Sequence, residues 1–156
     1  MPRLERAVAS LRISGDDLIP KELSQQLDAL PTRAYRKNQT VPIGTSGRNR
    51  IARTGGWALH ATETVPENLD AQVAELLGRL NPDLSVWQAL STRFHIDLFC
   101  GWFMSESNEG VEIAPATLLA LGERGILLSI DLYAPDPESA DYGESDDGVV
   151  LTHSID

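Results

Sequence analysis

Apolar and polar residues alternate along several segments of the chain, and this period of two predicts β-strands. The alternation is clear over residues 7–14, 57–62, 94–104 and 127–133, and a shorter strand is expected over 33–37. In residues 94–104 apolar side chains occupy both faces of the predicted strand. We therefore expect that strand to be central in a sheet and to be covered partly on both sides.

Apolar residues spaced three or four apart predict helices between these strands. Two helices open with a proline at their first position, Pro20 and Pro115, and run to about Leu30 and Arg124. Proline suits this position because its missing N–H would have no partner there. A third amphipathic helix is expected over residues 69–80.

The two helices opened by proline share a local pattern with the strand-like residues before them. In residues 18–27 and 113–121 an aliphatic residue lies two positions before the proline, and a leucine lies three positions after it. We interpret this as one supersecondary unit used twice, with leucines of both helices facing the core. The leucines are Leu23, Leu27, Leu30, Leu118 and Leu121.

The remaining segments carry weaker signals. Val86, Trp87 and Leu90 suggest a further helical turn or two, whereas the proline, glycine and serine content of residues 38–56 predicts a long loop. Beyond Ala134 we expect an irregular acidic loop. A short edge strand over 149–155 is expected to follow it.

The order of these elements predicts one α+β domain over residues 1–156. Its first six elements match the ferredoxin-like split βαβ arrangement, with an antiparallel or mixed sheet, helices on one face and one face open. A further αβ unit extends this arrangement. The core is expected over residues 8–133, with 134–156 contributing the acidic loop and the edge strand.

Several separated motifs resemble the bacterial family called domain of unknown function 4279. The motifs are Ser-Leu-Arg-Ile-Ser-Gly-Asp-Asp-Leu-Ile-Pro (10–20), Leu-Pro-Thr-Arg-Ala-Tyr-Arg-Lys (30–37), Thr-Gly-Gly-Trp-Ala-Leu (54–59), the segment from Ile113 to Ile126, and Ile-Asp-Leu-Tyr (130–133). The resemblance covers roughly residues 8–133 and implies no activity, cofactor or site.

Charge and composition narrow the classes of function. The formal net charge of −10 argues against general binding to nucleic acid or anionic membranes. No segment has the length and apolarity of a signal peptide or a membrane span, so we expect a cytoplasmic protein. The single cysteine, Cys100, rules out an intramolecular disulfide and suits a small buried apolar residue.

The charges are strongly segregated along the chain. Residues 29–62 contain no acidic side chain, whereas the six basic ones in this window are Arg33, Arg36, Lys37, Arg48, Arg50 and Arg53. Residues 131–147 contain no basic side chain, and their acidic ones are Asp131, Asp136, Glu138, Asp141, Glu144, Asp146 and Asp147. Each segment is either a solvated loop, with or without contact to the other segment, or a surface for an oppositely charged partner.

Polar residues of several strands are expected to share the open face of the sheet: Arg12, His60, His95, Asp97 and Asp131. This set leaves four interpretations open. They are a solvated face with an ion pair from Arg12 to Asp97 or Asp131, a recognition surface, an acid/base pair of His95 and Asp97, and a metal site of two histidines and a carboxylate. We assign no metal, cofactor or catalytic residue.

The glycine-rich segment 44–56 is a candidate anion-binding loop through Arg48, Arg50 and Arg53. Guanidinium groups and backbone N–H groups can hold phosphate. The segment lacks the Gly-Lys-Ser/Thr ending of a phosphate-binding P-loop, and a strand rather than a helix is predicted after it. The loop alone therefore does not identify a nucleotide-binding protein.

These observations favour a binding module without catalytic activity. The leading hypothesis is an inhibitor or immunity-type protein that masks a basic protein partner through Asp141, Glu144, Asp146 and Asp147. The alternative is a small-ligand or phosphate-binding protein, or an enzyme, that uses the open sheet face. A homodimer in which open faces or edge strands pair is a third hypothesis.

Overall fold

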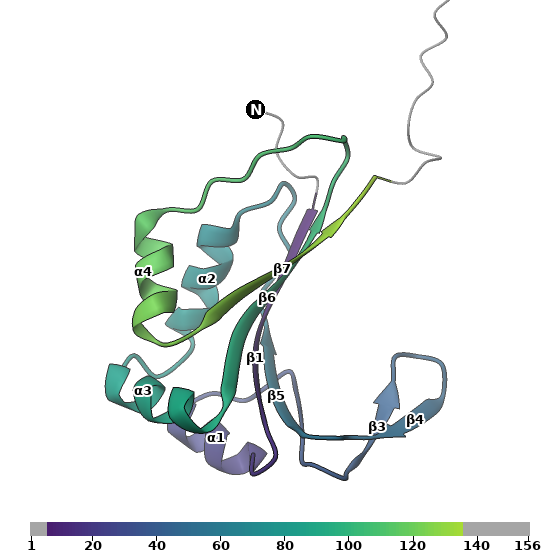
Figure 1. The fold of residues 1–156 in the computed structure, drawn as a ribbon, viewed down its shortest axis with the longest axis vertical. Coiled ribbons are helices and arrows are strands. Elements are labelled where there is room, and N and C mark those ends of the chain that lie inside the picture. The colour runs from purple at the N-terminus through teal and green to yellow at the C-terminus, as the bar shows by residue number, and fades with distance from the viewer. Residues whose placement is uncertain (1–5, 136–156) are drawn as a thin grey trace, which may run out of the picture.

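The computed structural model of the chain describes residues 6–135 and contains seven strands and four helices (Figure 1). In chain order they are β1 (Arg6–Gly15), α1 (Pro20–Leu27), β2 (Arg33–Tyr35), β3 (Thr40–Ile43), β4 (Arg48–Ile51), β5 (Gly55–His60), α2 (Leu69–Gly78), α3 (Leu84–Arg93), β6 (His95–Phe103), α4 (Pro115–Glu123) and β7 (Leu127–Tyr133). None of these helices is long and apolar enough to span a bilayer.

Five of the strands form one mixed sheet in the order β2-β5-β1-β6-β7. β2, β5, β1 and β6 pair with one another in antiparallel fashion, whereas β7 lies parallel to β6. β6 lies between two strands, with six of its nine residues buried and Phe99 and Phe103 partly exposed, as its two-sided apolar pattern predicts. The combination of this sheet with four helices confirms the predicted α+β class.

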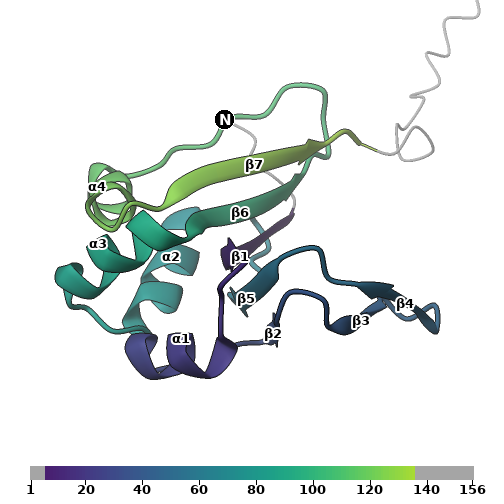
Figure 2. The ribbon, with the colours of Figure 1, turned by 60° about the horizontal axis from the view of Figure 1, so that its bottom comes forward.

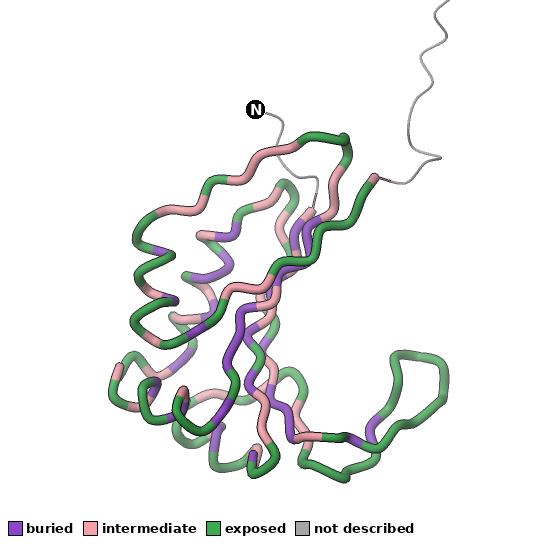
Figure 3. The backbone as a smooth tube through the Cα atoms, in the orientation of Figure 1, coloured by how far each residue is buried: buried purple, intermediate pink, exposed green. Residues whose placement is uncertain are grey.

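All four helices lie on one face of the five-stranded sheet, and the other face is open (Figure 2). The core lies between the helices and the sheet, and buried segments follow β1, β5 and β6 (Figure 3). Along β1 buried and more exposed residues alternate, so Leu11 and Ile13 point to the helices while Arg12 points to the open face. The alternation in the sequence therefore predicted which side chains of β1 face the helices and which face the open side of the sheet.

Two of the leucines expected in the core are exposed. Leu30 is 82% exposed because α1 ends at Leu27 and Asp28 adopts a left-handed conformation, which turns the chain away from the helix axis. On α4, Leu118 is 51% exposed, and Thr117 is buried in its place. Asp70 accounts for this exchange, because its carboxylate accepts a hydrogen bond of 2.6 Å from the Thr117 hydroxyl and binds α4 to α2.

The expected long loop over residues 38–56 is wrong, because most of this segment forms strands. β3 and β4 pair as a separate two-stranded hairpin that projects from the body of the molecule (Figure 1). Gly44 and Gly47 supply positive φ angles of 52° and 73° at its turn. Because these glycines and Pro42 interrupt the apolar alternation, they hid the two short strands from the sequence pattern.

The segment around Val86 is also more regular than expected, since it forms the complete helix α3. Asp83 caps this helix by accepting a hydrogen bond from the Ser85 backbone N–H. A hydrogen bond from the Ser85 hydroxyl, together with this backbone bond, holds the pKa of the Asp83 carboxyl below its usual value. The predicted edge strand 149–155 lies outside the described residues.

Candidate functional site

The open face of the sheet places side chains from neighbouring strands in rows. One row runs from Arg33 on β2 over Ala58 on β5 to Arg12 on β1 and Asp97 on β6. Because neighbouring strands lie roughly 4.8 Å apart, the Cα atoms of Arg33 and Arg12 are about 10 Å apart across Ala58. Two arginine side chains thus begin on either side of a position where the sheet carries only a methyl group.

Arg12 and Asp97 form a bidentate ion pair on this face. Arg12 Nε donates to Asp97 Oδ1 at 2.9 Å, and Nη2 donates to Oδ2 at 2.6 Å. The Asp97 side chain is 6% exposed and that of Arg12 is 47% exposed, so the arginine covers the carboxylate. The hydrogen bond to Asp97 raises the pKa of Arg12, and burial partly opposes this effect. The Arg12 guanidinium also lies 4.3 Å from the centroid of the Phe99 ring.

A hollow of about 490 Å³ opens over this row, with His60 beside Ser10 on one side of the row and His95 beside Ser14 on the other. Its floor consists of small residues, namely Ser10, Ser14, Gly56 and Ala58, and its walls include Arg12, Arg33, Tyr35, His60, His95 and Phe99. This volume is within the range of small-molecule sites in proteins. The sheet is therefore concave where these small residues meet, and the open face is not flat.

Tyr35 forms one wall of the hollow by lying directly over Gly56. A methyl group added at Gly56 would lie 2.7 Å from Tyr35 Cζ and 2.8 Å from its hydroxyl oxygen. Only glycine allows the ring this close to the sheet. The guanidinium carbons of Arg33 and Arg50 lie 5.5 Å and 5.6 Å from the centroid of the same ring.

The hollow carries an excess of positive charge. Asp97 supplies the one carboxylate among the described lining residues, and its charge is offset by the ion pair with Arg12. Arg33 donates a hydrogen bond of 3.2 Å to the Pro42 carbonyl and forms no ion pair within the described residues. This site is therefore suited to an anion, although the whole chain is strongly acidic.

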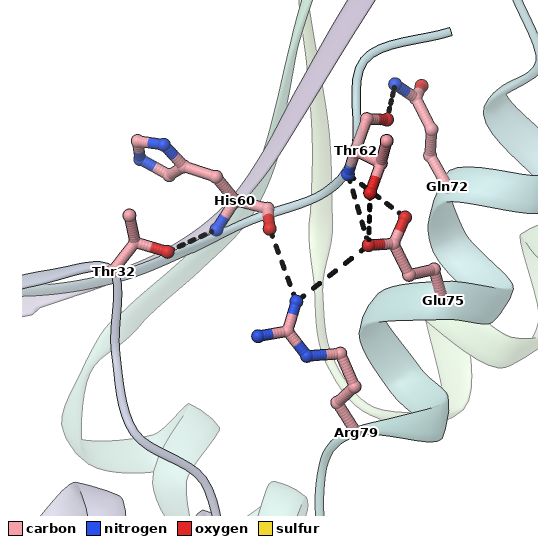
Figure 4. Close-up of polar contacts among 6 residues, drawn as sticks. All are labelled: Thr32, His60, Thr62, Gln72, Glu75 and Arg79. Carbon is pink, nitrogen blue, oxygen red and sulfur yellow. Dashed lines mark hydrogen bonds and ion pairs between the residues drawn. The ribbon is translucent and has the colours of Figure 1, made fainter.

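The backbone at the end of β5 is fixed by contacts with α2, and this arrangement presents His60 to the hollow. The His60 backbone N–H donates to Thr32 Oγ1, and its carbonyl accepts from Arg79 at 3.5 Å (Figure 4). Thr62 donates to the carboxylate of Glu75 on α2, one turn before Arg79, which caps the C-terminal end of this helix. The His60 imidazole extends away from these contacts (Figure 4).

The structure brings four of the five predicted open-face residues to the hollow: Arg12, His60, His95 and Asp97. Asp131 lies on β7 opposite Gly101 and does not line the hollow. No three His, Cys, Asp or Glu side chains within residues 6–135 are grouped so that they could hold a metal ion.

The structure describes the arginines of the candidate anion-binding loop but not the four acidic residues predicted to bind a partner. Arg48 and Arg50 lie on β4 and Arg53 follows it, so the candidate anion-binding loop is the hairpin and the residues at its base. The acidic residues Asp141, Glu144, Asp146 and Asp147 lie outside the residues that the structure describes.

Arg33, Tyr35 and Phe99 line the hollow but were not predicted as site residues. Arg33 and Tyr35 alternate within the short predicted strand 33–37, which placed them on one face of that strand. The missing information was its partner, because only pairing of β2 with β5 places both side chains beside Ala58 and Gly56.

Cys100 lies in the core on the opposite side of the sheet from the hollow. Burial raises the pKa of its thiol to about 12, with smaller contributions from Glu67 and Asp97. A thiol with so high a pKa is not a nucleophile at neutral pH. This agrees with the prediction of a small buried apolar residue.

Fold and site together define an α+β protein with a cationic hollow on the open face of a helix-backed mixed sheet. The chain matches the family model described as "Domain of unknown function (DUF4279)" over residues 5–135, and it belongs to that family. No curated protein and no solved structure matches the chain.

Proposed function

We propose that this protein binds a small anionic ligand, a phosphate or carboxylate compound, in the hollow on its open sheet face. The observation that carries the proposal is the charge of the lining: Asp97 is paired with Arg12, and Arg33 adds a positive charge with no carboxylate partner among the described residues. A guanidinium group in a concave site binds such anions through charge-assisted hydrogen bonds. Tyr35, His60 and the serines of the floor can supply further donors.

We further propose that the scaffold is the ferredoxin-like split βαβ arrangement extended by one αβ unit. Two observations support this. Strands β2, β5, β1 and β6 are neighbours in this order and alternate in direction, while α4 connects β6 to the parallel strand β7. Helices on one face of such a sheet leave the other face for a ligand.

Replacing Arg33 with alanine should weaken binding of inorganic phosphate about tenfold, because one charge-assisted hydrogen bond contributes roughly 1.5 kcal/mol or more. Isothermal titration calorimetry at fixed ionic strength measures the change. Arg93→Ala is the matched control, since Arg93 lies on α3 in the helical layer and the variant loses the same charge. Equal weakening in both variants would show that only net charge matters and would refute the proposed site.

A second proposal concerns the acidic segment, in which seven carboxylates occur without a basic residue. We propose that it can also bind a basic protein, because complementary charge speeds association with such a partner. Changing Asp141, Glu144, Asp146 and Asp147 to their amides should reduce capture of a basic partner from the native cell extract several-fold. Capture that does not change would exclude the acidic segment from this role.

A further inference from the structure

A second hollow of about 600 Å³ lies beside the first, at the base of the β3–β4 hairpin. It is lined by Tyr35, Arg50, Ile51, Arg53 and Thr54. Tyr35 lines both hollows, so they meet at this side chain. The two concave regions are therefore adjacent on one side of the molecule.

Two guanidinium groups lie beside the Tyr35 ring, one from the lining of each hollow. Arg33 lines the first hollow and Arg50 lines the second, and both guanidinium groups contact the ring of Tyr35. Arg50 Nη2 also lies 3.5 Å from the Tyr35 hydroxyl oxygen. The ring thus holds two positive charges close together at the boundary between the hollows.

These cations lack carboxylate partners within residues 6–135. The ion pairs in that part of the chain involve Arg6, Arg12, Lys37, Arg79 and Arg124, but not Arg33, Arg50 or Arg53. The two positive charges beside the Tyr35 ring repel one another, and an anion bound between them would offset that repulsion. Several negative charges along one ligand would satisfy all three arginines together.

We propose that the two hollows form one groove for an extended small polyanion of the linear oligophosphate class. This inference rests on the proposed anion site and names its ligand class. Guanidinium groups match the geometry of phosphate oxygens and bind them bidentately. A long nucleic acid is disfavoured because the net charge of −10 repels a polymer that extends beyond the groove.

The experiment compares orthophosphate, pyrophosphate and tripolyphosphate by calorimetry on the full chain at constant ionic strength. Tripolyphosphate should bind at least about tenfold more tightly than orthophosphate, with one ligand per chain. The variant Arg50→Ala/Arg53→Ala should lose this gain and change orthophosphate affinity less than about twofold. The control Lys21→Ala/Arg93→Ala, which removes two charges from the helical layer, should keep the gain.

Equal affinity for the three phosphates, or two ligands per chain, would overturn the single groove while leaving the anion site intact. No binding of any phosphate would instead refute the proposed function. Tighter binding of a ten-residue oligothymidylate through Arg50 and Arg53 would replace the oligophosphate with single-stranded nucleic acid. A synthetic peptide of residues 136–147 that binds more tightly than tripolyphosphate would likewise replace it with an acidic peptide.

Discussion

Replacing Arg12 with leucine is expected to lower the free energy of unfolding by about 3 kcal/mol. The variant leaves the carboxylate of Asp97, which is 6% exposed, without its bidentate partner. A buried charge without a partner costs several kcal/mol, and we expect the lower part of that range because Arg12 itself is 47% exposed. Urea unfolding followed by tryptophan fluorescence measures the change.

The double variant Arg12→Leu/Asp97→Leu separates this explanation from a simple loss of packing. Two apolar residues of similar volume remove both charges, so stability should return to within about 1 kcal/mol of the parent protein. Asp97→Asn alone should cost less than Arg12→Leu, because an amide needs less solvation than a carboxylate. A double variant as unstable as Arg12→Leu would contradict the role of the unpaired charge.

The pairing of Arg12 with Asp97 could be predicted in part from the sequence. Alternation along residues 7–14 and 94–104 assigned both side chains to the open face, and an ion pair of Arg12 with Asp97 or Asp131 was one of the four interpretations of that face. The sequence could not choose between the two carboxylates, since the choice depends on strand register. The structure places Arg12 directly opposite Asp97 and places Asp131 one strand further away.

The hollow itself was much harder to predict because it lies where the open face carries small residues and a glycine without a side chain. Gly55 and Gly56 at the start of β5 had the composition of a loop, so neither was expected in the sheet. The wall beside them requires pairing of the three-residue strand β2 with β5, a contact between segments about twenty residues apart. Local patterns carry no information about such pairing, since strand partners are set by the whole fold.

The hairpin shows the same limit at shorter range. Its strands pair Val41 with Arg50 and Ile43 with Arg48, so apolar and basic residues face one another across the ladder. Most of these side chains are exposed, and no alternation of apolar residues marks a buried face. Arg50 and Arg53 were predicted from the sequence as candidate anion ligands, but their position in a hollow beside Tyr35 follows only from the hairpin geometry.

The consecutive glycines of β5 should respond differently to alanine, Gly55 with a loss of stability and Gly56 with a loss of ligand affinity. At Gly55 an added methyl carbon would lie 2.8 Å from the Gly15 carbonyl oxygen and 2.8 Å from Leu18 Cβ. Gly15 pairs with Gly55 across β1 and β5, so the clash can be relieved only by moving backbone. We expect Gly55→Ala to lower the free energy of unfolding by about 3 kcal/mol, the upper part of the range for overpacking.

At Gly56 the methyl group would meet the far end of the Tyr35 side chain, which can rotate away. We expect Gly56→Ala to change the free energy of unfolding by less than about 1 kcal/mol, since alanine also restricts the unfolded chain. The displaced ring would no longer form the wall that the two hollows share. Affinity for tripolyphosphate should therefore fall at least about tenfold in Gly56→Ala.

Urea unfolding and calorimetry on both variants measure the two effects separately. Gly78→Ala is the control, because a methyl group there contacts nothing and should stabilise α2 by roughly 0.5–1 kcal/mol. If Gly56→Ala keeps full affinity for tripolyphosphate, the position of Tyr35 over the sheet does not shape the ligand site. If Gly55→Ala is as stable as the parent, β1 and β5 can separate at this point without cost, and the close packing of Gly55 against Gly15 does not hold the base of the site in place.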